Sequence, residues 1–169
     1  TVKPYNGSLV KKMAPMADTR VTSAFDTLGF KIKYETSLPD GSLGGCFNAG
    51  DGTITLTRMH INDDLDDTIY HELGHFLSFI AGHVDNSAEY KAIYNSEKAR
   101  YRKAFMDSRY AVSSSAEYFA ESYMEYVLEP GKLKSAVPKT YAAIQSSLKK
   151  ITPEKLYASA TYRGLYSDF

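Results

Sequence analysis

The chain has 169 residues, enough for one compact domain with a sizeable core, and its 20 Lys and Arg residues balance its 20 Asp and Glu residues. A formal charge of zero argues against a nucleic-acid-binding protein, which needs a basic surface, and no apolar run is long enough to span a bilayer. Cys46 is the only cysteine, which excludes an internal disulfide and a Cys-rich zinc site; we expect it to be a small packing residue. Thr1 is not a start Met and no signal peptide follows it, so we expect a mature or trimmed chain.

The N-terminal third predicts a helical region followed by strands. The helical pattern runs from about Ser8 to Leu28; Pro15 splits or starts it, and Gly29 is a natural stop. Alternating apolar and polar residues and short β-prone runs predict strands over 30–35, 46–48 and 53–57. The turn residues 49–52 between the last two strands indicate a hairpin.

An acidic cluster, 62–67, precedes the next helical pattern. Carboxylates at this place suit the N-cap and first turn of a helix, where unpaired N–H groups and the positive end of the helix dipole lie. Calcium binding is the alternative, but the cluster lacks the glycine and the distal Glu of an EF-hand loop.

The second half of the chain predicts mostly helices. One runs from about Ser87 to Met106, and another from about Ser115 to Leu128, ending at Pro130-Gly131. A last helix starts at Pro138, and its expected core stripe is Tyr141, Ile144, Leu148 and Ile151. Because strands come first and helices afterwards, the pattern predicts an α+β fold rather than alternating βαβ units.

The segment His71-Glu72-Leu73-Gly74-His75 carries the most specific chemistry. A helix brings residues four apart onto one face, so both imidazoles can reach one metal ion, and the Glu between them is placed to take a proton from a metal-bound water. The apolar stripe Ile69, Leu73, Phe76, Leu77 and Ile80 lies on roughly the opposite side. An accidental pair of surface histidines is the alternative, yet the chain has only 4 histidines and two fall at metal spacing.

A third protein ligand is needed for a catalytic zinc site. His83 does not fit, because the longer metzincin motif needs Gly at 78 and His at 81, where this chain has Ser78 and Ala81. Glu117 and Glu121 are better candidates: they share one helix face, and one as a ligand with the other accepting from a ligating imidazole would relieve their repulsion. A solvated acidic face, or a capping box that joins the first of them to Ser114, is the alternative.

Residues 53–151 resemble the protease domain of anthrax lethal factor and, more closely, the secreted bacterial Pro-Pro endopeptidases. The resemblance rests on a strand leading into the His-Glu-x-x-His helix, then a Tyr, then Ala116-Glu117-Tyr118-Phe119-Ala120-Glu121, then the stretch 132–141. It implies that Glu117 is the third zinc ligand and that Glu121 supports the site behind a ligating histidine. It also implies that Tyr110 faces the reacting carbonyl oxygen, where a phenol O–H can stabilise an oxyanion.

The resemblance further implies a zincin-like fold of one domain, residues 1–169, with a small mixed sheet whose exposed edge strand packs on the His-Glu-x-x-His helix. Residues 1–60 then form a helix and the sheet, 61–151 the zinc-binding helical part, and 152–169 a tail. An extended substrate would add along an edge strand near 46–48 or 53–57.

The expected function is a secreted zinc-dependent endopeptidase with one Zn²⁺ per chain, a metal-activated water and Glu72 as general base. Its partner is a peptide or protein substrate; the oligomeric state is not indicated. Proline-containing substrates are suggested by the family, but its Pro-Pro endopeptidases carry tryptophan near the cleft and this chain has none. The alternatives are a non-catalytic zinc-stabilised binding or toxin-accessory module and a metal-free interaction domain.

Overall fold

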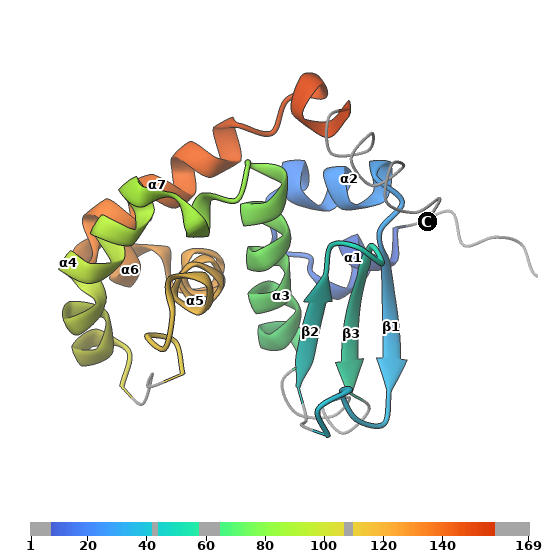
Figure 1. The fold of residues 1–169 in the computed structure, drawn as a ribbon, viewed down its shortest axis with the longest axis horizontal. Coiled ribbons are helices and arrows are strands. Elements are labelled where there is room, and N and C mark those ends of the chain that lie inside the picture. Colours follow the sequence, from blue (N-terminus) through green and yellow to red (C-terminus); the bar gives the residue numbers. More distant parts are fainter. Residues whose placement is uncertain (1–7, 42–43, 58–64, 107–109, 158–169) are drawn as a thin grey trace, which may run out of the picture.

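The computed structural model describes residues 8–41, 44–57, 65–106 and 110–157. In chain order its elements are α1 (Leu9–Met13), α2 (Thr19–Thr27), β1 (Lys31–Glu35), β2 (Gly45–Asn48), β3 (Thr53–Thr57), α3 (Leu65–Ile80), the 3₁₀ turn η2 (Val84–Asn86), α4 (Ala88–Ala104), α5 (Ser115–Leu128), α6 (Pro130–Ala136) and α7 (Pro138–Lys149). Figure 1 shows the sheet on one side of α3 and helices α4 to α7 on the other. The predicted α+β class is confirmed. None of the described helices is long and apolar enough to cross a membrane.

The predicted N-terminal helical region forms two short helices. Ser8 Oγ accepts from the Lys11 N–H at 3.2 Å and starts α1, while Asp18 Oδ1 accepts from the Arg20 N–H at 2.9 Å and starts α2. Gly29, with φ of 71°, adopts the left-handed conformation that ends α2. The expected split near Pro15 and the stop at Gly29 are therefore confirmed.

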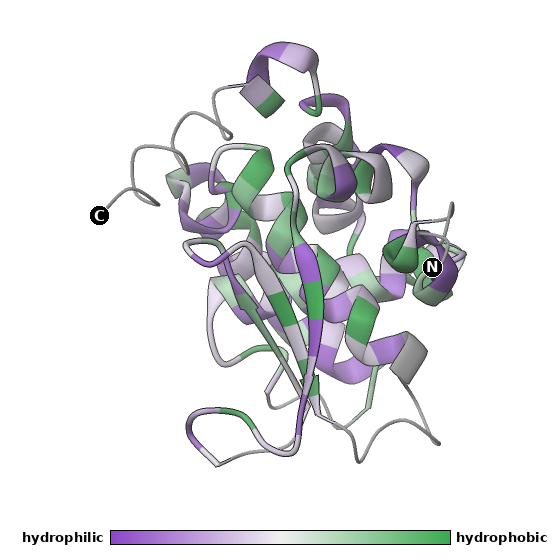
Figure 2. Cartoon of the chain, turned by 90° about the vertical axis from the view of Figure 1, so that its right-hand side faces the viewer, coloured by the Kyte–Doolittle hydropathy of each residue, from purple (hydrophilic) through white to green (hydrophobic). Residues whose placement is uncertain are grey.

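The sheet is small and mixed, with strand order β1-β3-β2. β3 pairs in parallel with β1 and antiparallel with β2, so the predicted hairpin between β2 and β3 is confirmed. The suggestion that 53–57 is an edge strand is wrong, because β3 has a hydrogen-bonded neighbour on each side. β2 is the edge strand beside α3 (Figure 1). Along β1, the other edge, hydrophilic and hydrophobic residues alternate (Figure 2).

The core lies where α3 meets the sheet and the other helices. All five residues of its predicted apolar stripe are at most 1% exposed: Ile69, Leu73, Phe76, Leu77 and Ile80. Phe76 also packs edge-to-face on Phe25 and Phe30, with ring centroids 5.2 and 5.0 Å apart. This burial fixes α3 between the two halves of the chain.

The helical half contains one helix more than predicted. α5 ends at Leu128, directly before Pro130-Gly131, as predicted, and Pro130 begins the short helix α6, which the sequence pattern did not predict. Proline is favoured at the first position of a helix, where its missing N–H has no partner to lose. In α7 the predicted stripe is confirmed most clearly at Ile144 and Leu148, which are fully buried.

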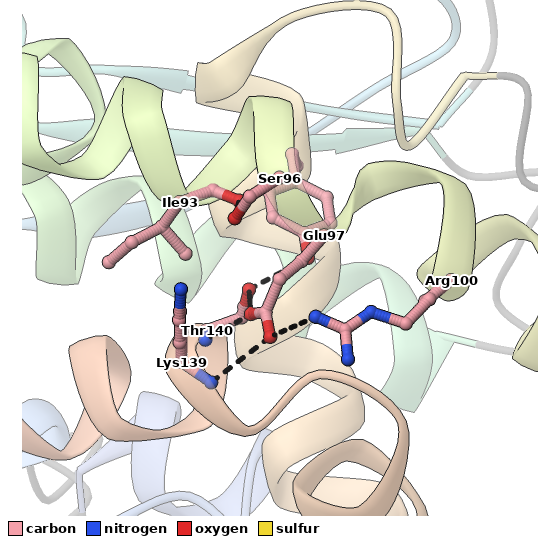
Figure 3. Close-up of polar contacts among 7 residues, drawn as sticks. Ile93, Ser96, Glu97, Arg100, Lys139 and Thr140 are labelled. Atoms are coloured by element: carbon pink, nitrogen blue, oxygen red, sulfur yellow. Dashed lines mark hydrogen bonds and ion pairs between the residues drawn. The ribbon is translucent and has the colours of Figure 1, made fainter.

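A buried carboxylate joins three of these helices (Figure 3). Glu97 of α4 is 0% exposed and accepts from the backbone N–H groups of Lys139 and Thr140, in the first turn of α7, at 3.2 and 2.6 Å. It also accepts from the Thr140 hydroxyl at 2.7 Å and from Arg100 at 3.1 Å. That hydroxyl lies 2.7 Å from the Tyr118 hydroxyl of α5. Glu97 therefore caps α7 from another helix and ties α5 to both.

Two further expectations from the sequence concern Cys46 and the acidic cluster, residues 62–67. Cys46 is exposed and lines the cleft described below, so the expectation that it is a small packing residue is wrong. Residues 62–64 of the acidic cluster lie outside the described part of the chain, so neither the N-cap nor the calcium alternative is tested there.

Candidate metal centre

Helices α3 and α5 carry all the predicted polar site residues except Tyr110, and they lie side by side (Figure 1). They come close together at Gly74. A Cβ built on this glycine would lie 2.7 Å from Ala120 Cα and 2.9 Å from Ala120 O, closer than any real contact allows. Because Gly74 precedes His75 and Ala120 precedes Glu121, this approach brings the polar residues of the two motifs together.

His71, His75 and Glu117 converge at this point. His71 Nε2 lies 3.1 Å from Glu117 Oε2, and His75 Nε2 lies 3.5 Å from Glu117 Oε1. Two donors about 2.1 Å from one ion at tetrahedral corners would be about 3.4 Å apart. Each of the three side chains offers one ligand atom, and these atoms lie within 4.8 Å of one another. The described residues thus contain a set with the spacing of metal ligands.

Glu117 combines this position with the start of α5. Its backbone N–H donates to Ser114 Oγ at 3.1 Å, so Ser114 is the N-cap of the helix. Its carboxylate turns to the histidines and its side chain is only 22% exposed. Of the two alternatives, the capping box is therefore formed only in part: Ser114 accepts from the Glu117 N–H, but the Glu117 carboxylate turns to the histidines. The other alternative, a fully solvated acidic face, does not apply to Glu117, because its side chain is largely buried.

His71 lies between two carboxylates. Its Nε2 faces Glu117, and its Nδ1 is 3.0 Å from Glu121 Oε1. These are ion-pair distances, but His71 Nδ1 and Glu117 Oε2 are both buried and neither has a partner in hydrogen-bond geometry. The structure thus brings Glu121 behind His71, opposite Glu117, as the sequence analysis expected.

The charges of this group depend on one another. Burial alone would lower the pKa of His71, but the carboxylates of Glu117 and Glu121 outweigh it and raise the pKa to about 10. Burial would raise the pKa of Glu117, yet His71 and His75 outweigh it and keep this pKa well below the usual range. Without a metal, His71 therefore holds a proton beside an ionised Glu117. A metal ion would have to displace that proton, because only a neutral imidazole is a ligand.

The residues present fit a zinc ion. Two imidazoles and one carboxylate form a donor set typical of catalytic zinc sites, which leave a fourth position open. A cation between them would also compensate the buried Glu117 oxygen that lacks a hydrogen bond. Glu121, at His71 Nδ1, is placed to orient that ring.

A cleft of about 860 Å³ opens above this group, within the size range of ligand sites. Residues 44–47 of the edge-strand region form one wall, and Tyr110 and α5 contribute the other. Glu72 also lines the cleft, although it is only 3% exposed. Its burial raises its pKa despite the nearby histidines, and a raised pKa suits a carboxylate that has to accept a proton.

Two other titratable groups lie on the cleft walls. Tyr110 follows the end of α4 in an irregular segment, is 63% exposed, and has its ring centroid 6.2 Å from that of His71. Burial and the charge of Glu117 raise the pKa of Tyr110 to about 12, so its hydroxyl keeps its proton. Burial and the charge of Glu72 raise the pKa of the Cys46 thiol, which disfavours a nucleophilic thiolate.

The structure therefore brings together all six predicted site residues: Glu72, Tyr110, His71, His75, Glu117 and Glu121. His83 is exposed, with a left-handed backbone, and is not part of the ligand group. Gly45 and Gly74, which make room for this arrangement, were not predicted as site residues. The signal for Gly74 was present, since a glycine inside a helical pattern often marks a close packing contact.

A small mixed sheet with an edge strand along the helix that carries His71 and His75, followed by a second helix that carries Glu117, is the architecture of a zincin-like domain. The family model described as "Anthrax toxin lethal factor, N- and C-terminal domain" matches residues 53–147, more than half of the sequence, and the chain belongs to this family.

A solved structure, that of the Pro-Pro endopeptidase PPEP-2 from Paenibacillus alvei, has a similar fold. Its TM-score is 0.62 at 21% sequence identity, over 86% of this chain and 92% of that one. No curated protein matches the sequence.

Proposed function

We propose that this protein is a zinc-dependent endopeptidase. The observation that carries the proposal is the convergence of His71, His75 and Glu117 from two helices, at the floor of a cleft that Glu72 also lines. Membership of the lethal factor domain family and the fold shared with a Pro-Pro endopeptidase support the same conclusion. The family and its relatives also support a secreted location, which we propose with the function.

Each side chain has a defined part in the proposed reaction. His71, His75 and Glu117 would hold a zinc ion, which would supply Lewis acidity to lower the pKa of a water and to polarise a carbonyl. Glu72 accepts the proton of the attacking water and returns it to the leaving amine. The Tyr110 hydroxyl, still protonated at neutral pH, donates to the oxygen that becomes negative as the amide is attacked.

The substrate is an extended segment of peptide or protein. β2 is an edge strand that lines the cleft, and an edge strand can add one more strand through backbone hydrogen bonds. Backbone pairing is independent of side chains, so it places a peptide without choosing its sequence. Cleavage next to proline is one specificity to test, because the structural relative is named a Pro-Pro endopeptidase.

The test compares two variants with different expected losses. Glu72→Ala should retain about one zinc per chain and a near-normal Tm but lose the cleavage of a diverse peptide library, read by mass spectrometry. Glu117→Ala should lose both zinc and cleavage. Cys46→Ser, on the cleft wall but without a role in the reaction, is the control and should cleave normally.

Three results would contradict the proposal. Wild type without zinc after careful purification would favour a metal-free interaction domain. Stoichiometric zinc without any cleavage would favour a non-catalytic zinc-stabilised module. More than a few per cent of wild-type kcat in Glu72→Ala would mean that another group acts as the base.

A further inference from the structure

Gly45 is the first residue of the edge strand β2, and it lies directly against the side chain of Glu72. A Cβ built on Gly45 would be 2.8 Å from Glu72 Oε1, 2.9 Å from Glu72 Cγ and 2.9 Å from Thr68 Cγ2. All three distances are below those that real Cβ atoms show. The backbone of Gly45 is not in the left-handed region, unlike that of its neighbour Gly44 with φ of 127°. Space, and not backbone conformation, therefore requires glycine here.

Phe47, the next residue on the same face of β2, differs from Gly45 in having a large side chain. Phe47 points to α3 as Gly45 does, since side chains alternate along a strand, and its ring lies 6.2 Å from that of Phe76 and 6.1 Å from that of Phe79. A large side chain thus fills the contact where α3 presents aromatic rings. The side chain is missing where α3 presents the carboxylate of Glu72.

The backbone of Gly45 faces the open edge of the sheet. Gly44 O accepts from the Thr57 N–H at 2.9 Å and the Gly44 N–H donates to Thr57 Oγ1 at 3.0 Å, so the backbone groups of Gly44 point towards Thr57, as in a hydrogen-bonded pair. In an antiparallel ladder such pairs alternate with pairs whose N–H and C=O groups point away from each other. Gly45, the next residue along and the partner of Leu56, therefore directs its N–H and C=O away from β3 and towards the free side of the strand.

We propose that Gly45 is a positioning residue, which seats the Glu72 carboxylate directly beneath the backbone groups that pair with the substrate strand. This inference rests on the proposed peptidase function. Because residue 45 has no side chain, the Glu72 carboxylate and the backbone of a paired substrate can both lie next to the same short stretch of β2. Any larger residue at 45 pushes Glu72 and the edge strand apart, so the base no longer meets the scissile bond that the strand presents.

The first test is kinetic. Gly45→Ala should lower kcat by about 10²-fold, the usual effect of a misplacement of about 1 Å, while KM changes by less than about threefold and zinc stays stoichiometric. Gly131→Ala is the matched control, because nothing lies within 4 Å of a Cβ built on Gly131; it should cleave normally. An unchanged kcat in Gly45→Ala, or a fall that Thr68→Ser restores completely, would overturn the proposal, since the contact with Glu72 would not be the limiting one.

The second test does not need activity. Gly45→Ala should lower the Tm of the wild-type chain by roughly 2–10 °C because of overpacking. In a Glu72→Ala background the shift should be clearly smaller, because two of the three clashing atoms are gone. Equal shifts in both backgrounds would refute the contact between residue 45 and Glu72. A wild type that cleaves no peptide would refute the proposed function instead, and this comparison would still decide whether Gly45 seats Glu72.

Discussion

The substitution Gly74→Ala sets two physical effects against each other inside the His-Glu-x-x-His helix. Helix propensity favours Ala over Gly by about 1 kcal/mol in a helix interior. The new methyl group, however, would lie 2.7 Å from Ala120 Cα, 2.9 Å from Ala120 O and 3.1 Å from Tyr123 Cβ. Two of these atoms belong to the backbone of α5 and cannot rotate away, so α3 and α5 must separate.

The sizes of these two effects decide whether Gly74→Ala stabilises or destabilises the protein. Overpacking a tight contact costs about 1–3 kcal/mol, and rigid backbone neighbours place this case at the upper end. After subtraction of the propensity gain, Gly74→Ala should destabilise the metal-free protein by about 1–2 kcal/mol, a fall in Tm of about 2–8 °C. Separation of the helices also moves Glu117 from His71 and His75. Metal–ligand distances tolerate changes of only about 0.2 Å, so zinc affinity should fall by about 10–100-fold.

Thermal unfolding of the metal-free chain and zinc competition with a chelator measure the two effects. Gly131→Ala in α6 is the control, because open space surrounds that position and propensity alone acts there; its Tm should stay constant or rise slightly. A higher Tm and an unchanged zinc affinity in Gly74→Ala would refute the reasoning. That result would mean that propensity exceeds packing, and that the approach of the two helices does not set the ligand geometry.

Three further substitutions and one pH series test other parts of the site. Glu121→Gln should weaken zinc binding by about 10–100-fold without abolishing it; unchanged affinity and rate would make Glu121 a surface residue. Tyr110→Phe should lower kcat by about 100-fold with little change in KM, whereas a raised KM at constant kcat would assign it to substrate binding. Glu97→Gln should destabilise the fold by about 1–3 kcal/mol in urea, since an amide cannot accept from all of its present donors; an unchanged midpoint would remove its capping role. Because Glu117 and Glu121 raise the pKa of His71 to about 10, we expect His71 to be protonated at neutral pH in the metal-free chain and zinc binding to release that proton. Apparent zinc affinity should therefore rise about tenfold per pH unit from pH 6 to 8, and a flat profile would mean that His71 is already neutral.

Local features of the sequence were sufficient to predict most of the helices and strands. Apolar periodicity placed α3 with its buried stripe, and Ser87, Ser114 and Gly29 set helix ends through short-range capping and backbone conformation. These effects act within a few residues, so they can be read without knowledge of the fold. The end of α5 before Pro130 was predicted from such a local signal, but helix α6, which begins at that same proline, was not.

The candidate site could be predicted in part. His71, Glu72 and His75 belong to one motif, and the helical period places the two histidines on one face. Glu117 is 46 residues away from His71 in the sequence, and its spacing to Glu121 also fits an ordinary acidic helix face. The resemblance to a family selected it, and in the structure its carboxylate lies 3.1 and 3.5 Å from the two histidines.

The sequence by itself thus determined which residues can form helices and strands, which faces are apolar, and which side chains carry metal and acid–base chemistry. Only the tertiary structure decided that β3 is central and β2 is the edge, that Glu97 caps a helix 42 and 43 residues further on, and that Gly45 and Gly74 make room for the site. It also decided the protonation of His71, which two carboxylates control. The physical reason is range: periodicity and capping act along the chain, whereas strand order, interhelical distance and electrostatic coupling depend on which distant segments pack together.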